Sequence, residues 1–474
     1  MTGLRSFVAH GIHFWSETDG SRRVPCYPGS MSDFPAGFVW GAATAAYQIE
    51  GGVQEGGRGA SVWDTFSHTA GRIRNGDTGD VACDHYHRYK EDVALMKELG
   101  LSAYRFSVAW PRVQPEGRGR TNAAGLAFYD ALTDELLEAG IQPWPTLFHW
   151  DLPQALEDDG GWLNRDTAHR FEDYAFAVGE RLADRAAGFM TLNEPFVVMA
   201  LGYVLGIHAP GRRLGLAGGF ASAHHQLLAH GMAVRALREA GARQVGIANN
   251  YAPAWPATDR DADHQAAGQL DALHNHLFTD PILRGEYPSA VLDLVSAHAP
   301  QALDLVLSGD LATIAAPLDF LGVNYYQPDH VTADPQSPFG AKVEGVPGRE
   351  RTNFGWSVVP EALTQTLTNL KARYGDLCPA IYVTESGCSQ ADVVQDGRVR
   401  DEARIRYHEA HLEAVATAIE QGTDVRGYFA WSLMDNFEWA EGYSQRFGLV
   451  YVDFETQERT PKDSYHWLKR RIGG

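Results

Sequence analysis

Two segments of the chain, GFMTLNEP at residues 188–195 and IYVTESG at residues 381–387, have the same arrangement. Each contains a short run of apolar and β-branched residues, which is typical of a buried strand. Each run is followed by an acidic residue, Glu194 in the first segment and Glu385 in the second. A single acid at a strand end commonly caps a helix or forms an ion pair, so neither segment alone indicates a function.

Six further runs of this kind occur along the chain, and most are separated by segments with helical periodicity. The stripe Tyr89, Val93, Met96 and Leu99 steps by 4, 3 and 3 residues, as one face of a helix does, and similar stripes occur in residues 363–374 and 405–419. Strands that alternate with helices favour parallel pairing, and eight parallel strands can close into a barrel. The eight predicted strands are Phe38–Ala43, Ala103–Val108, Gln142–Phe148, Gly188–Asn193, Val245–Asn250, Phe320–Tyr325, Ile381–Glu385 and Gly427–Trp431.

The sequence therefore predicts an α/β fold, a (β/α)8 TIM barrel that forms a single domain with extended βα loops. The 474 residues exceed the roughly 250 of a minimal barrel, which leaves room for insertions. A doubly wound open sheet fits the pattern of strands and helices almost as well. The barrel is favoured because the unusual residues fall at the C-terminal ends of the strands, where barrel enzymes place their active sites.

Two stretches do not follow this alternation. Residues 1–30 are mixed and polar without a clear period, and we expect them to form a poorly ordered N-terminal extension to a barrel domain at residues 31–474. Residues Asp329–Asn353 are rich in Pro and Gly and are predicted to form a long loop.

A chain shortened to begin at Met31 should keep the catalytic rate and the melting temperature of the full chain, because the extension is expected to lie outside the barrel. Initial rates and thermal unfolding of the two chains measure this. A large loss of either would mean that the extension packs on the core.

Composition and charge narrow the classes of partner. The chain has 60 acidic residues against 40 Lys and Arg, and this net charge of −20 argues against nucleic acid or an anionic membrane as partners. No apolar run approaches the about 18 residues of a membrane span, and His10, Gly11 and His13 interrupt the apolar residues near the start, so that no secretory signal is expected. The four cysteines form no CxxC pair. We therefore expect a cytoplasmic protein.

Polar and aromatic side chains also occur at the ends of the other predicted strands. In a parallel barrel these ends face one cavity, so the side chains should meet the two acids there. Amide, imidazole and carboxylate groups match the donors and acceptors of sugar hydroxyls, and a pair of carboxyl groups is what glycoside cleavage requires. These strand-end residues are Gln48, Arg105, His149, Trp150, Asp151, Asn324, Tyr325, Tyr326 and Trp431.

Several longer motifs occur in a fixed order along the chain. FPAGFVWG at residues 34–41 is followed by YQIEG at 47–51, by the Asn-Glu-Pro and Thr-Glu-x-Gly motifs around the two acids, and by PKDS at 461–464. In the order and spacing of these motifs, over about residues 33–470, the sequence resembles glycoside hydrolase family 1, the β-glucosidase family.

The resemblance implies a role for each matching residue. Glu194 is similar to the acid/base of the family and Glu385 to its nucleophile, with Arg105 and Tyr326 positioning and tuning that nucleophile. One position departs from the family, because Ser386 replaces the Asn that usually follows the nucleophile, and this puts in question only the detailed support of Glu385. The residues implied to bind substrate are Gln48, His149, Trp150, Asn193, Asn324, Tyr326, Trp356, Trp431, Glu438, Trp439 and Phe447.

No cofactor and no metal are expected. His85 and His87 lie close to Cys83 and Asp84, but the spacing matches no known zinc motif such as HExxH. We interpret the two histidines as polar residues at the start of a helix.

Three alternative functions are considered. A sugar-binding barrel without activity is expected to have lost one of the two carboxylates, and both are present. A 6-phospho-β-glycosidase is expected to have Ser and basic residues after the eighth strand, where this chain has NFEWAEGY at residues 436–443 and Glu438 would repel a phosphate dianion. A transglycosidase uses the same two carboxylates, so the sequence leaves it open.

The resemblance thus implies a retaining β-glycosidase that hydrolyses terminal non-reducing β-D-glucosyl residues, and also galactosyl and fucosyl residues, by double displacement. Small β-glycosides and oligosaccharides are the expected partners, and the oligomeric state is left open. Double displacement requires the carboxyl groups of Glu194 and Glu385 to lie about 5–5.5 Å apart.

Overall fold

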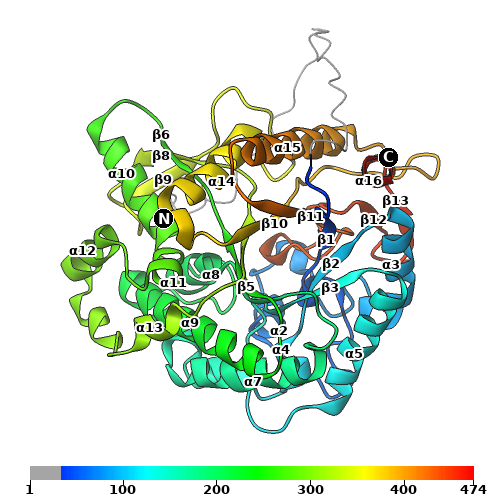
Figure 1. The fold of residues 1–474 in the computed structure, drawn as a ribbon, viewed down its shortest axis with the longest axis horizontal. Coiled ribbons are helices and arrows are strands. Elements are labelled where there is room, and N and C mark those ends of the chain that lie inside the picture. Colours follow the sequence, from blue (N-terminus) through cyan, green and yellow to red (C-terminus); the bar gives the residue numbers. More distant parts are fainter. Residues whose placement is uncertain (1–33, 474) are drawn as a thin grey trace.

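The computed structural model describes residues 34–473, and these form a closed barrel of eight parallel strands (Figure 1). The strands follow one another around the barrel in the order β1-β11-β10-β7-β5-β4-β3-β2, and β1 pairs with β11 to close it. This closure confirms the barrel and excludes the open doubly wound sheet. The barrel strands are β1 (Val39–Ala43), β2 (Ala103–Ser107), β3 (Gln142–Phe148), β4 (Phe189–Asn193), β5 (Val245–Asn250), β7 (Phe320–Asn324), β10 (Ala380–Ser386) and β11 (Val425–Trp431).

Helices surround the strands in a ring (Figure 1). The predicted stripes face the barrel, since Val93, Met96 and Leu99 of α3 are buried, as are Leu363 and Leu367 of α14. The α-helices are α1 (Ala46–Ile49), α2 (Val62–Ser67), α3 (His85–Leu99), α4 (Trp110–Val113), α5 (Ala123–Glu138), α6 (Gln154–Asp158), α7 (Asp166–Leu182), α8 (Pro195–Val197), α9 (Gly215–Glu239), α10 (Asp261–Asp271), α11 (Asp280–Arg284), α12 (Ser289–His298), α13 (Asp310–Ile314), α14 (Pro360–Tyr374), α15 (Glu402–Glu420) and α16 (Asp463–Gly473).

The predicted long loop at Asp329–Asn353 is wrong in its first half. The structure has two strands there, β8 (Asp329–Ala333) and β9 (Ala341–Glu344), which form a small sheet with β6 (Ala254–Pro256) beside the barrel. These two strands have only five and four residues. The Pro and Gly of the turn between them therefore outweigh the strand pattern in the local sequence. The pairing partner β6 also lies more than 70 residues earlier in the chain, so no local pattern indicates it.

An aromatic layer fills the lower half of the barrel interior. Trp144 of β3 packs against Tyr382, Phe320 and Phe429, with ring centroids 4.9, 5.3 and 5.7 Å apart. Gly41 of β1 makes room for this layer, because a Cβ at that position would lie 2.3 Å from the ring of Phe429. Interior side chains of a barrel stack in layers, so the next interior positions along the strands lie above the aromatic layer and form the floor of the cavity at the C-terminal face.

The extension predicted at residues 1–30 lies outside the described residues, and it stays a proposal together with the domain boundary at residue 31. Among the helices of residues 34–473, none combines the length and the apolar character that a membrane crossing requires.

Candidate active site

Glu385 lies at the end of β10 and has two charge-stabilising neighbours from other strands. The Nη1 of Arg105, on β2, donates to its Oε1 at 2.5 Å. The hydroxyl of Tyr326, just beyond β7, donates to its Oε2 at 2.7 Å. The side chains of Arg105 and Glu385 are buried and that of Tyr326 is partly buried, so the ion pair acts at short range in a low dielectric. These two contacts favour the ionised form of Glu385, whereas burial, the largest cause, raises its pKa.

Glu194 lies at the end of β4, where the chain turns into the short helix α8. Its backbone is left-handed, with φ of 46°. Pro195 follows as the first helical residue, where the fixed φ of proline and its missing N–H are well tolerated. The side chain is 6% exposed and accepts a hydrogen bond of 2.7 Å from the Nδ2 of Asn324. A non-glycine residue in this conformation is uncommon, and such positions cluster at functional sites.

The two carboxyl groups differ in their electrostatic surroundings. Burial raises the pKa of Glu194 well above its ordinary value, and the negative charge of Glu385 raises it further. Burial also raises the pKa of Glu385, but the guanidinium of Arg105 and the hydroxyl of Tyr326 act in the opposite direction. When the two groups hold a single proton, that proton is on Glu194, because of the two only Glu385 has a cation in contact. One carboxylic acid and one carboxylate thus lie at the C-terminal ends of β4 and β10, joined through Asn324, Asn193 and Arg105.

Asn193 connects this pair to His149. Its Oδ1 accepts from the Nη2 of Arg105 at 2.6 Å and from Asn324 at 3.0 Å, so its Nδ2 points toward the Nε2 of His149, 3.0 Å away. Burial and the charge of Arg105 hold the pKa of His149 well below its ordinary value. The ring is therefore neutral, with Nε2 as acceptor and the proton on Nδ1, which has no hydrogen-bond partner among residues 34–473.

Gln48 and Glu438 form a second polar group at the same face. The Nε2 of Gln48 donates to the side chain of Asn436 at 3.0 Å, to the carbonyl of Phe437 at 2.9 Å and to Glu438 at 3.4 Å. The Oε1 of Gln48 is a buried acceptor that no donor of the described residues meets. Burial, followed by the charge of Glu385, raises the pKa of Glu438 to about 8. Most buried polar atoms in proteins have a hydrogen-bond partner, so this acceptor is an exception at the C-terminal face.

The predicted aromatic residues form two clusters at the mouth. Trp439 packs on Trp150, with ring centroids 4.5 Å apart, and His149 lies between Trp439 and Trp431, at 5.8 and 5.7 Å. Trp150 also donates from its indole to the carbonyl of Asn193. In the second cluster the ring of Trp356 lies 5.1 Å from that of Tyr326 and 5.8 Å from that of Phe447. The predicted substrate-binding residues thus lie together at the C-terminal face of the barrel. The expectation is wrong for Tyr325, which follows β7 and points outward, with its hydroxyl donating to the carbonyl of Val359 at 2.6 Å and its ring 5.8 Å from that of His411 on α15, because successive side chains of a strand point to opposite faces. Among the described residues, no hydrogen bond joins Asp151 to the two acids.

Ser386, the position that departs from the family pattern, faces away from the cavity. Its hydroxyl lies 3.4 Å from that of Tyr407 on α15. The next residue, Gly387, passes so close to β11 that a Cβ there would lie 1.8 Å from the carbonyl oxygen of Trp431. Glu385 is therefore held by Arg105 and Tyr326, and the serine does not weaken that support.

Two threonines that have no indicated role in the sequence, Thr146 and Thr384, contact the polar network. Thr146 accepts from the Nε of Arg105 at 3.1 Å, and Thr384 donates to the Oδ1 of Asn324 at 2.6 Å. A threonine in a buried strand is common, so only its position directly before Glu385 could have drawn attention to Thr384. The two histidines at residues 85 and 87 behave as predicted, since α3 begins at His85 and each bonds to a neighbouring carboxylate.

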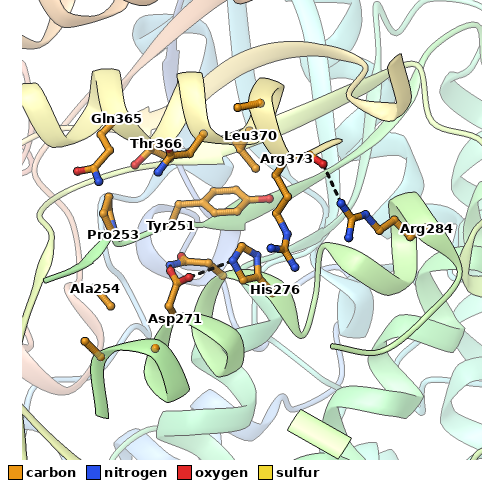
Figure 2. A pocket seen from close by; sticks show the side chains of 15 residues that line it. Tyr251, Pro253, Ala254, Asp271, His276, Arg284, Gln365, Thr366, Leu370 and Arg373 are labelled. Atoms are coloured by element: carbon orange, nitrogen blue, oxygen red, sulfur yellow. Dashed lines mark hydrogen bonds and ion pairs between the residues drawn. The ribbon is translucent and has the colours of Figure 1, made fainter. Parts of the chain in front are cut away.

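A groove of about 630 Å³ lies elsewhere, between α14 and the segment of α10 and α11 (Figure 2). Tyr251, His276 and Arg373 line it, and so does Arg284, whose guanidinium donates to the backbone carbonyl of Arg373 at 2.7 Å. The other charged groups are paired within the protein, His276 with Asp271 at 3.0 Å and Arg373 with a carboxylate of α11. The predicted site residues of the described chain are not among its lining, so the groove is separate from the candidate site.

The fold and the site together define a class of protein. A parallel barrel that holds a carboxylic acid and a carboxylate at its C-terminal face, among aromatic rings and unpaired donors and acceptors, is typical of barrel enzymes that cleave glycosidic bonds.

Comparison with known proteins identifies the family. The model of glycosyl hydrolase family 1 matches residues 30–473, and the chain belongs to this family. It is 46% identical over 447 residues to β-glucosidase A of Thermotoga maritima, covering 94% of this chain and 98% of that one. It is 47% identical to the bifunctional β-D-glucosidase/β-D-fucosidase of Bifidobacterium breve, covering 93% and 98% of the two chains. Its structure is similar to that of the psychrophilic β-glucosidase BglU of Micrococcus antarcticus, with a TM-score of 0.90, 46% identity and coverage of 94% and 99%.

Proposed function

We propose that the protein is a retaining β-glucosidase, which hydrolyses terminal non-reducing β-D-glucosyl residues by double displacement. The observation that supports this most directly is the unequal environment of the two carboxyl groups: within residues 34–473, a cation contacts Glu385 and none contacts Glu194. The β-glucosidases among its relatives, at 46% identity over nearly the whole chain, support the choice of glucose.

In the first step Glu385 is the nucleophile. Its carboxylate oxygen attacks the anomeric carbon, the glycosidic C–O bond breaks, and Glu194 transfers its proton to the departing oxygen, so that the alcohol leaves as a neutral molecule. The product is a glycosyl ester of Glu385. The hydrogen bonds from Arg105 and Tyr326 orient the attacking oxygen.

In the second step Glu194 acts as the base. Formation of the ester removes the negative charge of Glu385, which is one of the causes that raise the pKa of Glu194, so that this pKa falls. Glu194 can then take a proton from water while the water oxygen attacks the anomeric carbon and the ester bond breaks. Two inversions restore the original β configuration and free Glu385.

The remaining polar groups are proposed to hold the glucosyl ring. Hydroxyl groups both donate and accept, and they can satisfy the buried Oε1 of Gln48 and the Nδ1 of His149. Asn193 and Asn324 lie beside the two carboxyl groups, where bonds to the 2-hydroxyl strengthen toward the transition state. Trp431 and Trp439 are proposed to pack on the ring, with Trp150 behind Trp439, while Trp356 and Phe447 line the leaving-group side.

The stereochemical course tests the mechanism. Because double displacement retains configuration, ¹H NMR at early times should show β-glucose as the first product from an aryl β-glucoside, before mutarotation. A carboxyl separation near 9 Å, or α-glucose as the first product, would indicate inversion by a single displacement. A transglycosidase would instead release the aryl alcohol faster than glucose, with the difference recovered as new glycosides.

The choice of sugar is a further part of the proposal. Gln48 and Glu438 can accept from either an equatorial or an axial 4-hydroxyl, so we expect β-galactosides and β-fucosides to be hydrolysed as well. The relative in Bifidobacterium breve, a glucosidase and fucosidase, supports the fucoside. A glucoside with a 6-phosphate is expected to be a poor substrate. Its phosphate dianion would lie beside Glu438, and residues 436–443 contain no Lys or Arg to pair with it.

Glu438→Ser should therefore lower kcat/KM on the β-glucoside, by about 10- to 100-fold for a lost hydrogen bond to a buried carboxyl group. The same change should raise the ratio of 6-phosphoglucoside to glucoside activity. Initial rates of the wild type and of Glu438→Ser on the aryl β-glucoside and the aryl 6-phospho-β-glucoside measure this. A wild-type enzyme that prefers the phosphorylated substrate would contradict both the role of Glu438 and the choice over a 6-phospho-β-glycosidase.

The cytoplasm is proposed as the place of action. Cys83, Cys378 and Cys388 are all free thiols, and two of them are buried, as is usual in a reducing compartment. Assay of β-glucosidase activity in the cytosolic and extracellular fractions of the native cells tests this.

A further inference from the structure

We propose that the hydroxyl of Thr384 is a positioning group that holds the Asn324 amide in the place from which it contacts Glu194 and Asn193. The inference rests on the proposed glycosidase mechanism. A threonine in a buried strand, such as Thr384, does not by its residue type indicate this role.

The direction of an amide is decided by its partners, and Asn324 has partners on both sides. The hydroxyl of Thr384 donates to Oδ1 at 2.6 Å. The Nδ2 group on the other side donates to Glu194 at 2.7 Å and to Asn193 at 3.0 Å. The Oδ1 of Asn193 is an acceptor, because Arg105 donates to it, so a reversed Asn324 amide would bring two amide oxygens together. In the direction that Asn193 imposes, the threonine hydroxyl donates to the buried Oδ1, which would otherwise lack this partner, and so holds the amide in place.

The local backbone places Thr384 for this contact. The pairing of β10 with β7 shifts by one residue between Val383 and Glu385, as in a β-bulge, and Thr384 is the residue within that shift. On the facing strand, Gly322 leaves space for it, because a Cβ there would lie 2.8 Å from the Oγ1 of Thr384. The side chain is completely buried, and the hydroxyl therefore stays on one partner.

The backbone of Thr384 also contacts Arg105, the partner of Glu385. The carbonyl of Thr384 accepts from the Nη1 of Arg105 at 3.2 Å, the same nitrogen that contacts Glu385. The hydrogen bond of Asn324 lowers the pKa of Glu194 and that of Glu385 against the effect of burial. A less firmly held amide stabilises both carboxylates less, so both pKa values should rise.

Thr384→Val keeps the shape of the side chain and removes only the hydroxyl. The profile of kcat/KM against pH should keep its bell shape but move to higher pH by about half a unit to one unit on both limbs, because a hydrogen bond to a charged group is weakened but not abolished. The value of kcat at the optimum should fall by about 10- to 100-fold with a smaller change in KM. Thr384→Ser restores the hydroxyl and should return both the profile and most of the rate.

Two further measurements separate positioning from packing. Thr366→Val on α14 removes a buried hydroxyl that bonds only within its own helix, and it should leave rate and profile unchanged. In a chain with Asn324→Ala, the additional change Thr384→Val should have almost no effect, because the residue through which it acts is gone.

Three outcomes would overturn the inference. In the first, Thr384→Val has the wild-type pH profile. In the second, the Ser and Val variants are equally impaired, and in the third the effect of Thr384→Val persists at full size in the Asn324→Ala chain. Failure of the proposed function is distinguishable, since it would appear as a wild-type enzyme that hydrolyses no aryl β-glycoside.

Discussion

Glu385→Gln should abolish turnover of every β-glycoside, with kcat lower by roughly 10⁵-fold or more. The amide is nearly the same size as the carboxylate, but it is a poor nucleophile and has no charge to stabilise the developing oxocarbenium ion. The change also leaves the guanidinium of Arg105 buried without its ion pair. Stopped assays with 4-nitrophenyl β-glucoside, β-galactoside and β-fucoside measure the loss.

Two controls show that such a loss is chemical. The variant should still bind the glucoside, as measured by calorimetry, because its sugar contacts are intact. Glu98→Gln removes an exposed carboxylate that pairs with Lys469 on the surface and should leave the rate unchanged. If Glu385→Gln retained more than about a hundredth of the wild-type rate on a good substrate, Glu385 would not be the nucleophile.

Glu194→Gln should have an effect that depends on the leaving group. For an alkyl or phenyl glucoside, whose alcohol must be protonated as it departs, kcat/KM should fall by about 10²- to 10⁴-fold. For a 2,4-dinitrophenyl glucoside, whose phenol leaves as an anion, kcat/KM should stay within about tenfold of the wild type, since this quantity reports the first step. A series of aryl glucosides should therefore show a much steeper dependence on leaving-group pKa in the variant.

The second step gives an independent readout of the same variant. Without a base to activate water, the glycosyl ester should accumulate with the dinitrophenyl substrate, so that a burst of phenol precedes a slow steady state. Azide needs no deprotonation and should accelerate that steady state, forming β-glucosyl azide. An equal loss on all leaving groups, without a burst, would remove Glu194 from the acid/base role.

The barrel could be predicted because each of its eight strands, and the helices α3, α14 and α15, have a clear pattern in the local sequence. Runs such as Gln142–Phe148 and Val245–Asn250 coincide with β3 and β5, and no predicted strand end differs from the observed one by more than two residues. The two acids could be found for the same reason, since each directly follows such a run. The small sheet of β6, β8 and β9 was missed because its strands are short and their partners distant.

The network that joins the acids could not be predicted in this way. The direction of the Asn324 amide depends on Thr384, Asn193 and Glu194, which come from two other strands. A bulge in the pairing of β10 with β7 brings Thr384 to face Asn324, and a shift of one residue is not encoded in the composition of either strand. The proton asymmetry between the acids likewise depends on Arg105, which reaches Glu385 across the barrel.

The last helix, α16, lies beside the end of α3, where Tyr465 donates to the carbonyl of Leu95 and Lys469 pairs with Glu98. The chain runs from this end of α3 into the start of β2, so α16 lies toward the face of the barrel opposite the sugar cavity. A tether joined to the chain after α16, whether to a fusion partner or to a solid support, would therefore hold the molecule with its cavity directed outward. Substrates attached to insoluble material could then still enter it.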